Sequence, residues 1–303
     1  MGPTGVGKTD LMIELHSQFP IKIIGVDSVQ IYKHLNIGSG KPSSNLLKKY
    51  PHDLVDIIEP TENYSTARFQ EDVIKSIKDS FEEERIPILV GGTMMYFHHL
   101  VEGISKLPKV SEAIRAQVES EFEREGSQKM HDHLKTIDSK SSTKIHFNDS
   151  QRIKRAIEVY RSTGQELSKW QEEKKKEVSE IITKSNLKQI ALIPESRDLH
   201  REVISERFKM MIKEGLVEEV EDILNIKGMS YASHSMKSVG YRQVCEYLAG
   251  DHGLDDMIEK SVNATRQLAK RQMTWINNWN NLIKVDKKES PLDTVNDLIK
   301  KNI

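Results

Sequence analysis

The sequence has a single cysteine and no long run of apolar residues. Because Cys245 stands alone, the chain can form neither an internal disulfide nor a zinc site built from paired cysteines, and we interpret it as a small, partly buried side chain rather than a reactive thiol. No segment approaches the ~20 apolar residues that cross a bilayer, and the N-terminus has no basic stretch leading into an apolar one. We therefore expect a cytoplasmic protein that does not enter a membrane.

Net charge is also nearly absent, because 45 lysines and arginines face 46 aspartates and glutamates. A general attraction to nucleic acid is excluded, so any RNA binding must come from local basic patches. Hydrophobic residues make up 37% and charged residues 30%, which is typical of a folded globular protein. With 303 residues, the chain is long enough for two compact units, and we expect it to act as a monomer.

Short apolar runs rich in β-branched residues alternate with helical patterns, which predicts an α/β fold with a parallel sheet. The predicted strands are residues 21–26, 54–58, 86–90 and 189–193. Strand signals then disappear between about residue 109 and residue 186, where the sequence is charged and helix-periodic. We expect an inserted all-helical domain over 109–186, with residues 1–108 and 187–303 forming the α/β core.

One helix of the predicted insert is well marked. Asp149 can cap its start, Gly164 can end it, and apolar residues repeat at helical spacing between them. Thr163 and Glu166 fit a capping box that would start another helix. The charged stretch 170–180 is interpreted as a solvated helix face.

The first residues match the phosphate-loop motif G-x-x-x-x-G-K-[ST] at every fixed position. Glycines allow backbone N–H groups to converge on phosphate oxygens, the following helix N-terminus adds positive potential, Lys8 adds a charge, and Thr9 can ligate Mg²⁺. We therefore predict a core resembling P-loop NTPases that binds a diphosphate or triphosphate, through the residues Gly2, Pro3, Thr4, Gly5, Val6, Gly7, Lys8 and Thr9. The loop does not specify the reaction.

A phosphate loop ordinarily follows a buried strand, but only Met1 precedes Gly2. We expect that the chain lacks its leading strand through truncation or a misassigned start. Restoring the upstream residues should then add the strand and raise the activity.

Five further segments accompany the phosphate loop: 27–32 (DSVQIY), 37–42 (IGSGKP), 91–96 (GGTMMY), 238–243 (SVGYRQ) and 264–272 (ATRQLAKRQ). In this order they closely resemble the bacterial tRNA dimethylallyltransferases, also called isopentenyl-tRNA transferases, over nearly the whole chain. Relative to that pattern, the strand before the phosphate loop is missing. The zinc finger of eukaryotic relatives cannot form with one cysteine.

The resemblance implies transfer of a dimethylallyl group from dimethylallyl diphosphate to the 6-amino group of an adenosine in tRNA. The acceptor lies just 3′ of the anticodon in tRNAs that read codons beginning with U. Diphosphate is released and Mg²⁺ is required. The implied partners are the tRNA anticodon stem-loop and dimethylallyl diphosphate.

Three residues are the candidate catalytic groups. Asp27 follows an apolar strand at the edge where α/β sheets bind ligands, so it can remove a proton from the weakly nucleophilic adenine amine. From the residues alone, Asp27 could instead hold Mg²⁺ through water; the resemblance favours the base. By resemblance, Arg207 is a cation on the leaving diphosphate and Thr93 contacts the reacting region, although an ordinary salt-bridged helix residue and a turn hydroxyl remain alternatives.

The target base must leave its stack to reach the allyl group, and splayed loop bases must be held by protein contacts. The resemblance, together with basic residues outside the apolar helix faces, predicts tRNA contacts at Asp27, Ser28, Val29, Gln30, Thr93, Arg115, Gln151, Arg152, Ile153, Lys154, Arg155, Lys237, Ser238, Val239, Gly240, Tyr241, Arg242, Arg266 and Lys270. Trp275 is expected to be a core residue rather than a platform for base stacking.

Four other functions compete with this hypothesis. A small-molecule P-loop kinase is the chief alternative, because it would use the same loop and Mg²⁺ on ATP. A GTPase is less favoured because no N-K-x-D motif is present. A non-enzymatic RNA-binding module would not need Lys8 and Thr9, and an adenylate isopentenyltransferase would not need the helical insert.

Overall fold

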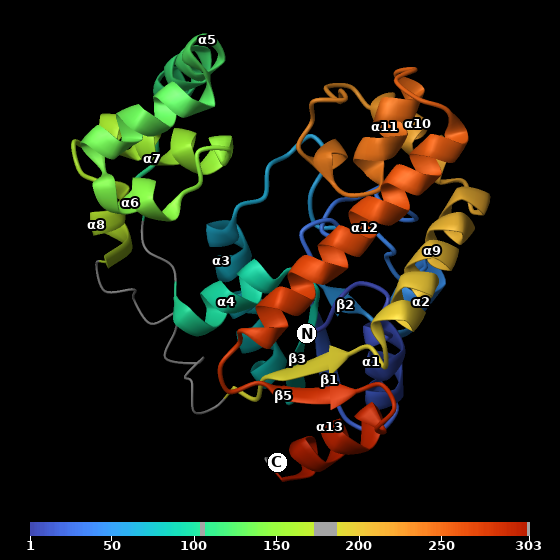
Figure 1. Ribbon diagram of the computed structural model, residues 1–303. Coiled ribbons are helices and arrows are strands. Elements are labelled where there is room, and N and C mark those ends of the chain that lie inside the picture. Colours follow the sequence, from blue (N-terminus) through green and yellow to red (C-terminus); the bar gives the residue numbers. More distant parts are fainter. Residues whose placement is uncertain (104–106, 173–186, 302–303) are drawn as a thin grey trace. The chain divides into compact units, whose positions relative to one another are not determined.

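The computed structural model describes residues 1–103, 107–172 and 187–301, and the chain divides into two compact units (Figure 1). The first unit comprises Met1–His99 and Lys184–Ile303, and the second comprises Leu100–Thr183. The second unit thus begins nearer the N-terminus than the expected residue 109, while the expected end at residue 186 lies outside the described residues.

Every strand pair that the structure describes in the first unit is parallel, as expected for an α/β fold. β1 (Ile21–Val26) lies between β2 (His52–Asp53) and β3 (Ile86–Gly91), and β4 (Ile190–Ile193) pairs with β5 (Ile283–Asp286). The predictions of β1, β3 and β4 are confirmed.

The predicted strand over 54–58 is wrong. Leu54 and Asp56 have φ angles of 62° and 57°, in the left-handed region that breaks an extended strand. Only an isolated bridge between Tyr32 and Ile58 forms there, and the strand itself lies earlier, at His52–Asp53. β5 was not predicted, because the segment Ile283–Asp286 is only four residues long and two of them are charged.

Met1 pairs with β4. Its amino group donates to the Ile190 carbonyl at 2.7 Å, and the Leu192 N–H donates to the Met1 carbonyl at 2.9 Å. These two bonds have the pattern of a parallel ladder. Met1 therefore extends the pairing of β4 on the side away from β5 and directs the following glycine loop to the carboxyl end of the strands.

The helices of the first unit surround the strands, and α12 packs against α9 and α11 (Figure 1). They are α1 (Lys8–His16), α2 (Ser44–Lys49), α3 (Thr66–Glu82), α4 (Met94–Glu102, which runs into the second unit), α9 (Arg197–Lys213), α10 (Leu216–Leu224), the 3₁₀ helix η1 (Ser235–Lys237), α11 (Tyr241–Leu248), α12 (Leu254–Asn277) and α13 (Pro291–Lys300).

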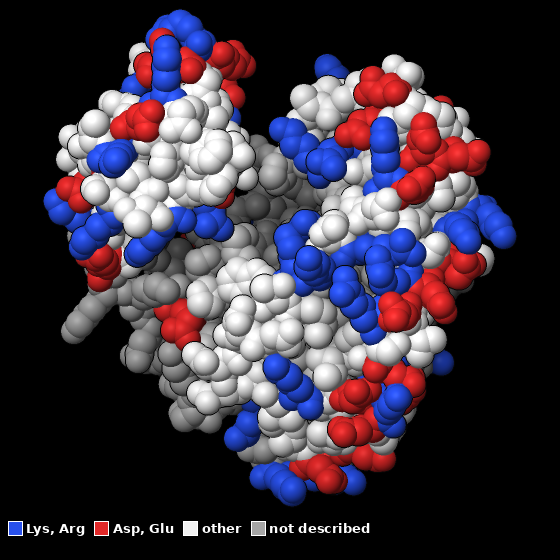
Figure 2. Space-filling view, viewed as in Figure 1, with Lys and Arg blue, Asp and Glu red and all other residues white. Residues whose placement is uncertain are grey.

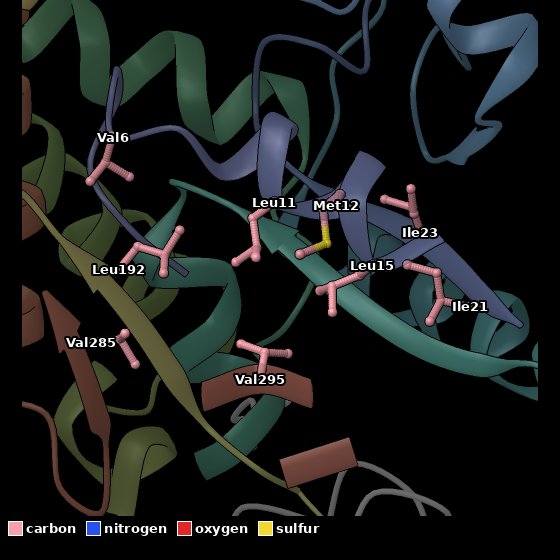
Figure 3. Close-up of a cluster of buried hydrophobic side chains, with 9 residues drawn as sticks. All are labelled: Val6, Leu11, Met12, Leu15, Ile21, Ile23, Leu192, Val285 and Val295. Atoms are coloured by element: carbon pink, nitrogen blue, oxygen red, sulfur yellow. The ribbon is translucent and has the colours of Figure 1, made fainter. Parts of the chain in front are cut away.

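The apolar core of the first unit joins α1 to both groups of strands. Leu15, Ile21, Ile23 and Val285 are 0–1% exposed and pack with Val6, Leu11, Met12, Leu192 and Val295 (Figure 3). Burying a large aliphatic side chain contributes roughly 1.5–3 kcal/mol, so this cluster anchors α1, the helix that follows the glycine loop.

The second unit is helical in its described part. It contains α5 (Glu112–Ile137), interrupted at Gly126 with φ 80° and ψ 166°, α6 (Ser139–Lys144), α7 (Ser150–Thr163) and α8 (Leu167–Glu172). The predicted limits of α7 are confirmed, because the Asp149 side chain accepts from the Arg152 N–H and Gly164 adopts a left-handed conformation.

The capping box is a wrong prediction, since Thr163 ends α7 and α8 begins only at Leu167. Most of the predicted helix face over 170–180 lies outside the described residues. Within the described parts of both units, none of the helices is long and apolar enough to span a membrane.

The Asp149 cap allows a test of local stability. Asp149→Ala removes the acceptor for the Arg152 N–H, so we expect the free energy of unfolding to fall by about 1 kcal/mol. Asp149→Asn keeps a side-chain oxygen there and loses only the exposed ion pair with Arg152, so it should stay within about 0.5 kcal/mol of wild type. Urea denaturation followed by circular dichroism measures both; equal losses would attribute the effect to the ion pair.

Candidate active site

The glycine loop connects Met1 directly to α1. Gly5 and Gly7 have φ angles of 77° and 94°, which a residue with a side chain rarely adopts. Gly7 is the N-cap of α1 and offers no side-chain cap, so the first N–H groups of the helix are available to an anion. The Lys8 amine donates to the carbonyls of Gly2 and Pro3 at 3.0 and 2.8 Å, which folds it over the loop.

Two side chains from late in the sequence hold this loop at Thr4. The Thr4 carbonyl accepts from His200 Nε2 at 2.8 Å, and the Thr4 N–H donates to Gln272 Oε1 at 2.9 Å. Both side chains are buried. Sequence reasoning missed both as site residues; the only signal was that Gln272 ends the segment 264–272.

Asp27 directly follows β1. Its Oδ1 accepts from the N–H groups of Val29 and Gln30 at 2.9 and 3.2 Å, and in the described chain no donor contacts Oδ2. Burial raises the pKa of the Asp27 carboxyl, while the two backbone bonds and the positive charges of Lys8 and Arg207 act in the opposite direction. The site therefore holds a carboxylate with one unoccupied oxygen and increased basicity.

Thr93 lies beside Asp27 because β3 ends next to β1. The Thr93 N–H donates to the Val26 carbonyl at 3.2 Å, and the Ser28 N–H donates to Thr93 Oγ1 at 3.0 Å. The Thr93 hydroxyl therefore holds the backbone of Ser28, the residue that follows Asp27, and its role is not limited to its own turn.

Arg207 approaches from α9. Its guanidinium lies 3.5 Å from Thr4 Oγ1 and 3.4 Å from the Gly40 carbonyl. A Cβ on Gly40 would lie 1.8 Å from Arg207 Nη2, so only glycine admits the guanidinium there. Burial lowers the pKa of Arg207, opposed by the negative charge of Asp27, but a guanidinium remains a cation at any physiological pH. The alternative of an ordinary surface ion pair does not describe this side chain.

The loop 36–41 is held by residues that were not predicted to act there. Glu219 accepts from the N–H groups of Asn36, Ile37 and Gly38 at 2.7–3.2 Å, and from Tyr241 Oη at 2.7 Å. Gln30 Nε2 donates to the carbonyls of Ser39 and Gly40 at 3.3 and 3.2 Å. Glu219 thereby positions the loop that contacts both Gln30 and Arg207.

Two of the residues predicted to contact tRNA have buried side chains. Tyr241 is 0% exposed and Ile153 is 0% exposed, so neither side chain can reach RNA from its place in the core. Tyr241 instead hydrogen-bonds the loop 36–41, and Ile153 packs in the helical core of the second unit. The expected tRNA contact is corrected for the side chain of Tyr241 because its neighbours cover it. Ile153 belongs to the apolar residues at helical spacing that were expected to be buried, so its side chain is likewise no tRNA contact.

The other predicted contacts of the first unit differ in exposure. Lys237, Arg242 and Lys270 are exposed, whereas Gly240 is buried and Arg266 donates to the Arg201 carbonyl at 3.4 Å. Ser28 is exposed, and Val29, Ser238 and Val239 are partly buried. Figure 2 shows Lys and Arg side chains gathered over α9 and α12 of this unit. Trp275 on α12 is 41% exposed, so its assignment to the core was wrong.

In the second unit, Arg115, Gln151 and Arg152 are exposed, and Arg152 forms one exposed ion pair with Asp149. Two neighbours on α7 have internal partners. Lys154 forms an ion pair with Glu119 at 2.7 Å, and Arg155 contacts the Pro108 carbonyl and Glu158. These contacts partly satisfy both cations and leave Arg152 as the most exposed basic side chain among the predicted residues of this helix.

The described residues contain no cluster of three or more His, Cys, Asp or Glu side chains able to hold a metal. Mg²⁺ in phosphate sites keeps several waters and takes only one or two protein ligands, with phosphate oxygens supplying the others. Thr9, in the first turn of α1, has the hydroxyl that such a site requires. The residues present therefore fit a magnesium ion that arrives with the phosphates.

Lys8 makes the loop sensitive to pH. Burial lowers the pKa of its amine to about 8, with Asp27 raising it and Arg207 lowering it. A bound diphosphate favours the charged amine and raises its pKa. The Lys8 contribution to binding is therefore complete well below pH 8 and declines as the pH rises from that value towards the higher pKa of the bound state. We expect the dissociation constant for inorganic diphosphate to rise about tenfold between about pH 7 and pH 9.

Calorimetric titration of the protein with inorganic diphosphate measures this dependence. Lys8→Arg is the control, because its guanidinium keeps its charge throughout the range and the titration of the ligand itself is common to both proteins. An equally steep dependence in Lys8→Arg would show that Lys8 is not the titrating group.

Comparisons with known proteins agree on one family. Residues 30–279 match the model of the family described as IPP transferase. A curated relative, tRNA dimethylallyltransferase 2 of Hahella chejuensis, is 42% identical over 289 residues, covering 92% of this chain and 87% of the relative.

Solved structures give the same result. The tRNA isopentenylpyrophosphate transferase of Bacillus halodurans is 30% identical with a TM-score of 0.70, covering 99% of this chain and 94% of that one. The corresponding enzyme of Staphylococcus epidermidis is 31% identical with a TM-score of 0.70, covering 100% and 98%. A eukaryotic dimethylallyltransferase acting on tRNA has the same fold, with a TM-score of 0.80 at 24% identity and coverage of 100% and 79%. From the family match over 30–279 and the 42% identity to a curated relative, the chain belongs to the IPP transferase family.

Proposed function

We propose that this protein transfers a dimethylallyl group from dimethylallyl diphosphate to the 6-amino group of the adenosine 3′ of the anticodon, in tRNAs that read codons beginning with U. One observation carries the proposal: a phosphate loop, a carboxylate with one oxygen free of donors and a partly buried arginine meet in a member of the IPP transferase family. The curated relative named tRNA dimethylallyltransferase 2 supports the same donor and acceptor.

Asp27 is the proposed general base. The adenine amine is a poor nucleophile because its lone pair is delocalised into the ring, so removal of a proton as the new bond forms lowers the barrier. Oδ1 is fixed by the backbone of Val29 and Gln30, which orients Oδ2 for the proton. Burial raises the pKa of the carboxyl and therefore strengthens it as a base.

The leaving diphosphate gains negative charge as the carbon–oxygen bond breaks. Lys8, the N–H groups at the start of α1 and Arg207 are placed to stabilise that charge. Magnesium, held by the Thr9 hydroxyl and the phosphates, would add further positive charge. The protein groups bind and orient the diphosphate before the reaction, so little reorganisation is needed at the transition state.

A core resembling P-loop NTPases is part of this proposal. The parallel strands, the loop that runs from Met1 into α1 and the polar residues at the carboxyl ends of β1 and β3 support it. Neither this arrangement nor the loop decides between ATP and an allylic diphosphate.

The second unit and the exposed cations of the first are the proposed tRNA-binding surfaces. Arg115, Gln151 and Arg152 are accessible on the second unit, and Lys237, Arg242 and Lys270 on the first. A tRNA substrate also supports a cytoplasmic location. The remaining predicted contacts, including Ser28, Val29, Ser238 and Val239, stay proposals for backbone or side-chain contacts near the reacting base.

Membership of the IPP transferase family favours prenyl transfer over the small-molecule kinase. The deciding experiment incubates the protein and Mg²⁺ with labelled dimethylallyl diphosphate and, in separate reactions, unmodified tRNA, AMP or no acceptor. Transfer to tRNA alone supports the proposal. Transfer to AMP indicates an adenylate isopentenyltransferase. ATP consumption without label transfer, in a parallel reaction supplied with ATP, indicates a kinase.

Asp27→Asn tests the general base. Asparagine keeps the acceptor for the Val29 and Gln30 N–H groups and removes the basic oxygen, so single-turnover transfer should slow by about 10²–10⁴-fold. Affinities for tRNA and dimethylallyl diphosphate should change little, because the loss belongs to the transition state.

Asp53→Asn is the matched control, because it neutralises a carboxylate at the end of the neighbouring strand β2 and should leave the rate unchanged. Loss of diphosphate affinity with rescue by excess Mg²⁺ would make Asp27 a metal-organising residue instead. A rate within a few-fold of wild type would remove its catalytic role.

Arg152→Gln tests the RNA surface of the second unit. The side chain is 72% exposed, and loss of one phosphate contact should reduce the log–log slope of tRNA affinity against salt by about 0.7–0.9. Arg124→Gln is the control, since this arginine is 67% exposed on α5 and paired with Glu125. Filter binding over a salt series measures both slopes. Equal effects of the two variants would mean a general charge effect.

A further inference from the structure

Gln272 on α12 joins the phosphate loop to the turn that carries Thr93. Its Oε1 accepts from the Thr4 N–H at 2.9 Å, and its Nε2 donates to the Gly92 carbonyl at 2.8 Å. The side chain is 7% exposed. An N–H partner on one side and a carbonyl on the other determine which atom of the amide faces which loop.

The two partners of Gln272 belong to opposite sides of the proposed reaction. Thr4 lies in the loop that binds the diphosphate, with its hydroxyl 3.5 Å from Arg207. Gly92 precedes Thr93, whose hydroxyl accepts from the N–H of Ser28, the residue next to Asp27. One amide therefore separates the donor side from the acceptor side.

The packing at this point leaves no space for another group. A Cβ on Gly92 would lie 2.5 Å from Gln272 Nε2 and 3.5 Å from the Gly2 carbonyl. A side chain at position 92 would therefore displace the Gln272 amide, which hydrogen-bonds both the turn and the phosphate loop. The length of a glutamine side chain sets the spacing between the loop and the turn.

We propose that Gln272 is a positioning residue that fixes the phosphate loop against the Gly92–Thr93 turn, so that the allylic carbon of the donor faces the acceptor amine beside Asp27. The inference rests on the proposed function. Gln272 itself contacts neither substrate and acts through Thr4 and Thr93. A misplacement of about 1 Å between reacting groups can reduce a rate by about 100-fold, so such a spacer affects the rate more than binding.

If the Gln272 amide had only a structural role, it would also hydrogen-bond two buried backbone groups. Its loss would then lower the free energy of unfolding. Two variants separate the roles. Gln272→Leu removes both bonds. Gln272→Glu keeps an oxygen for the Thr4 N–H but places a carboxylate oxygen against the Gly92 carbonyl, and protonation at lower pH restores an O–H donor there.

The experiment measures single-turnover transfer at saturating tRNA and dimethylallyl diphosphate from about pH 8 to about pH 6, each rate divided by the wild-type rate at the same pH. Gln272→Leu should be slower by about 10–100-fold at every pH. Gln272→Glu should be equally slow at the upper end and recover at least about fivefold relative to wild type at the lower end. Both substrate affinities should stay within about threefold.

Asn296→Leu is the matched control. Asn296 is another buried amide of the first unit, and it donates to Gln18 at 2.8 Å, outside the two loops that Gln272 joins. Its loss should lower the thermal midpoint without changing the rate, which separates the cost of losing a buried amide from loss of positioning.

Rates of both Gln272 variants within threefold of wild type would overturn the inference and leave the proposed function intact. A Gln272→Glu ratio that is constant with pH would also overturn it. The pH dependence of the Gln272→Glu rate ratio tests the inference even if Gln272→Leu fails to fold. A wild-type protein that transfers no label to tRNA would overturn the proposed function, and the inference with it.

Discussion

The in-register parallel pairing of β1 with β3 is the constraint on which the candidate site depends. Ile21 pairs with Ile86 and the register continues to Val26 and Gly91, so both strands end at the same edge. Asp27 and the Gly92–Thr93 turn must then emerge side by side. A slip of one residue would turn the buried faces of these strands to the wrong side, so the hydrophobic core and the site are determined together.

Long-range polar contacts turn this edge into a defined geometry. His200, Glu219 and Gln272 come from helices late in the chain, and each pairs with backbone groups of an early loop. A backbone N–H or carbonyl removed from water must find a partner, so each contact restricts where its loop can lie. Because the partners are side chains of packed helices, these hydrogen bonds hold the loops in place against the core.

The pKa shifts in the site arise because the packed helices and loops remove its charged groups from water. Burial raises the pKa of Asp27 and lowers the pKa of Lys8 and Arg207, while the negative charge of Asp27 opposes the shift of both cations. One carboxylate and two cations thus share a site that excludes much of the water. Such a site contains a stronger base, which removes a proton from a weak nucleophile. It also contains positive charge that water screens little, which favours departure of an anionic leaving group.

The sequence by itself determined the elements whose signals are local. Apolar, β-branched runs predicted β1, β3 and β4, and the capping residues Asp149 and Gly164 predicted the limits of α7. The glycine loop, Asp27, Thr93 and Arg207 were proposed as site residues from motifs and resemblance, and the structure places them close together. Local patterns suffice where the physical cause lies within a few residues.

Only the tertiary structure decided the features whose cause lies elsewhere in the chain. The apolar segment 54–58 is no strand because Leu54 and Asp56 take left-handed conformations. β5 was missed because it is four residues long with two charged residues, and its pairing with β4 is visible only in the structure. Burial likewise removed Tyr241 from the RNA-contacting side chains and placed Gln272 between two loops. Neighbouring helices decide which side chains are covered, and no motif within a single helix contains that information.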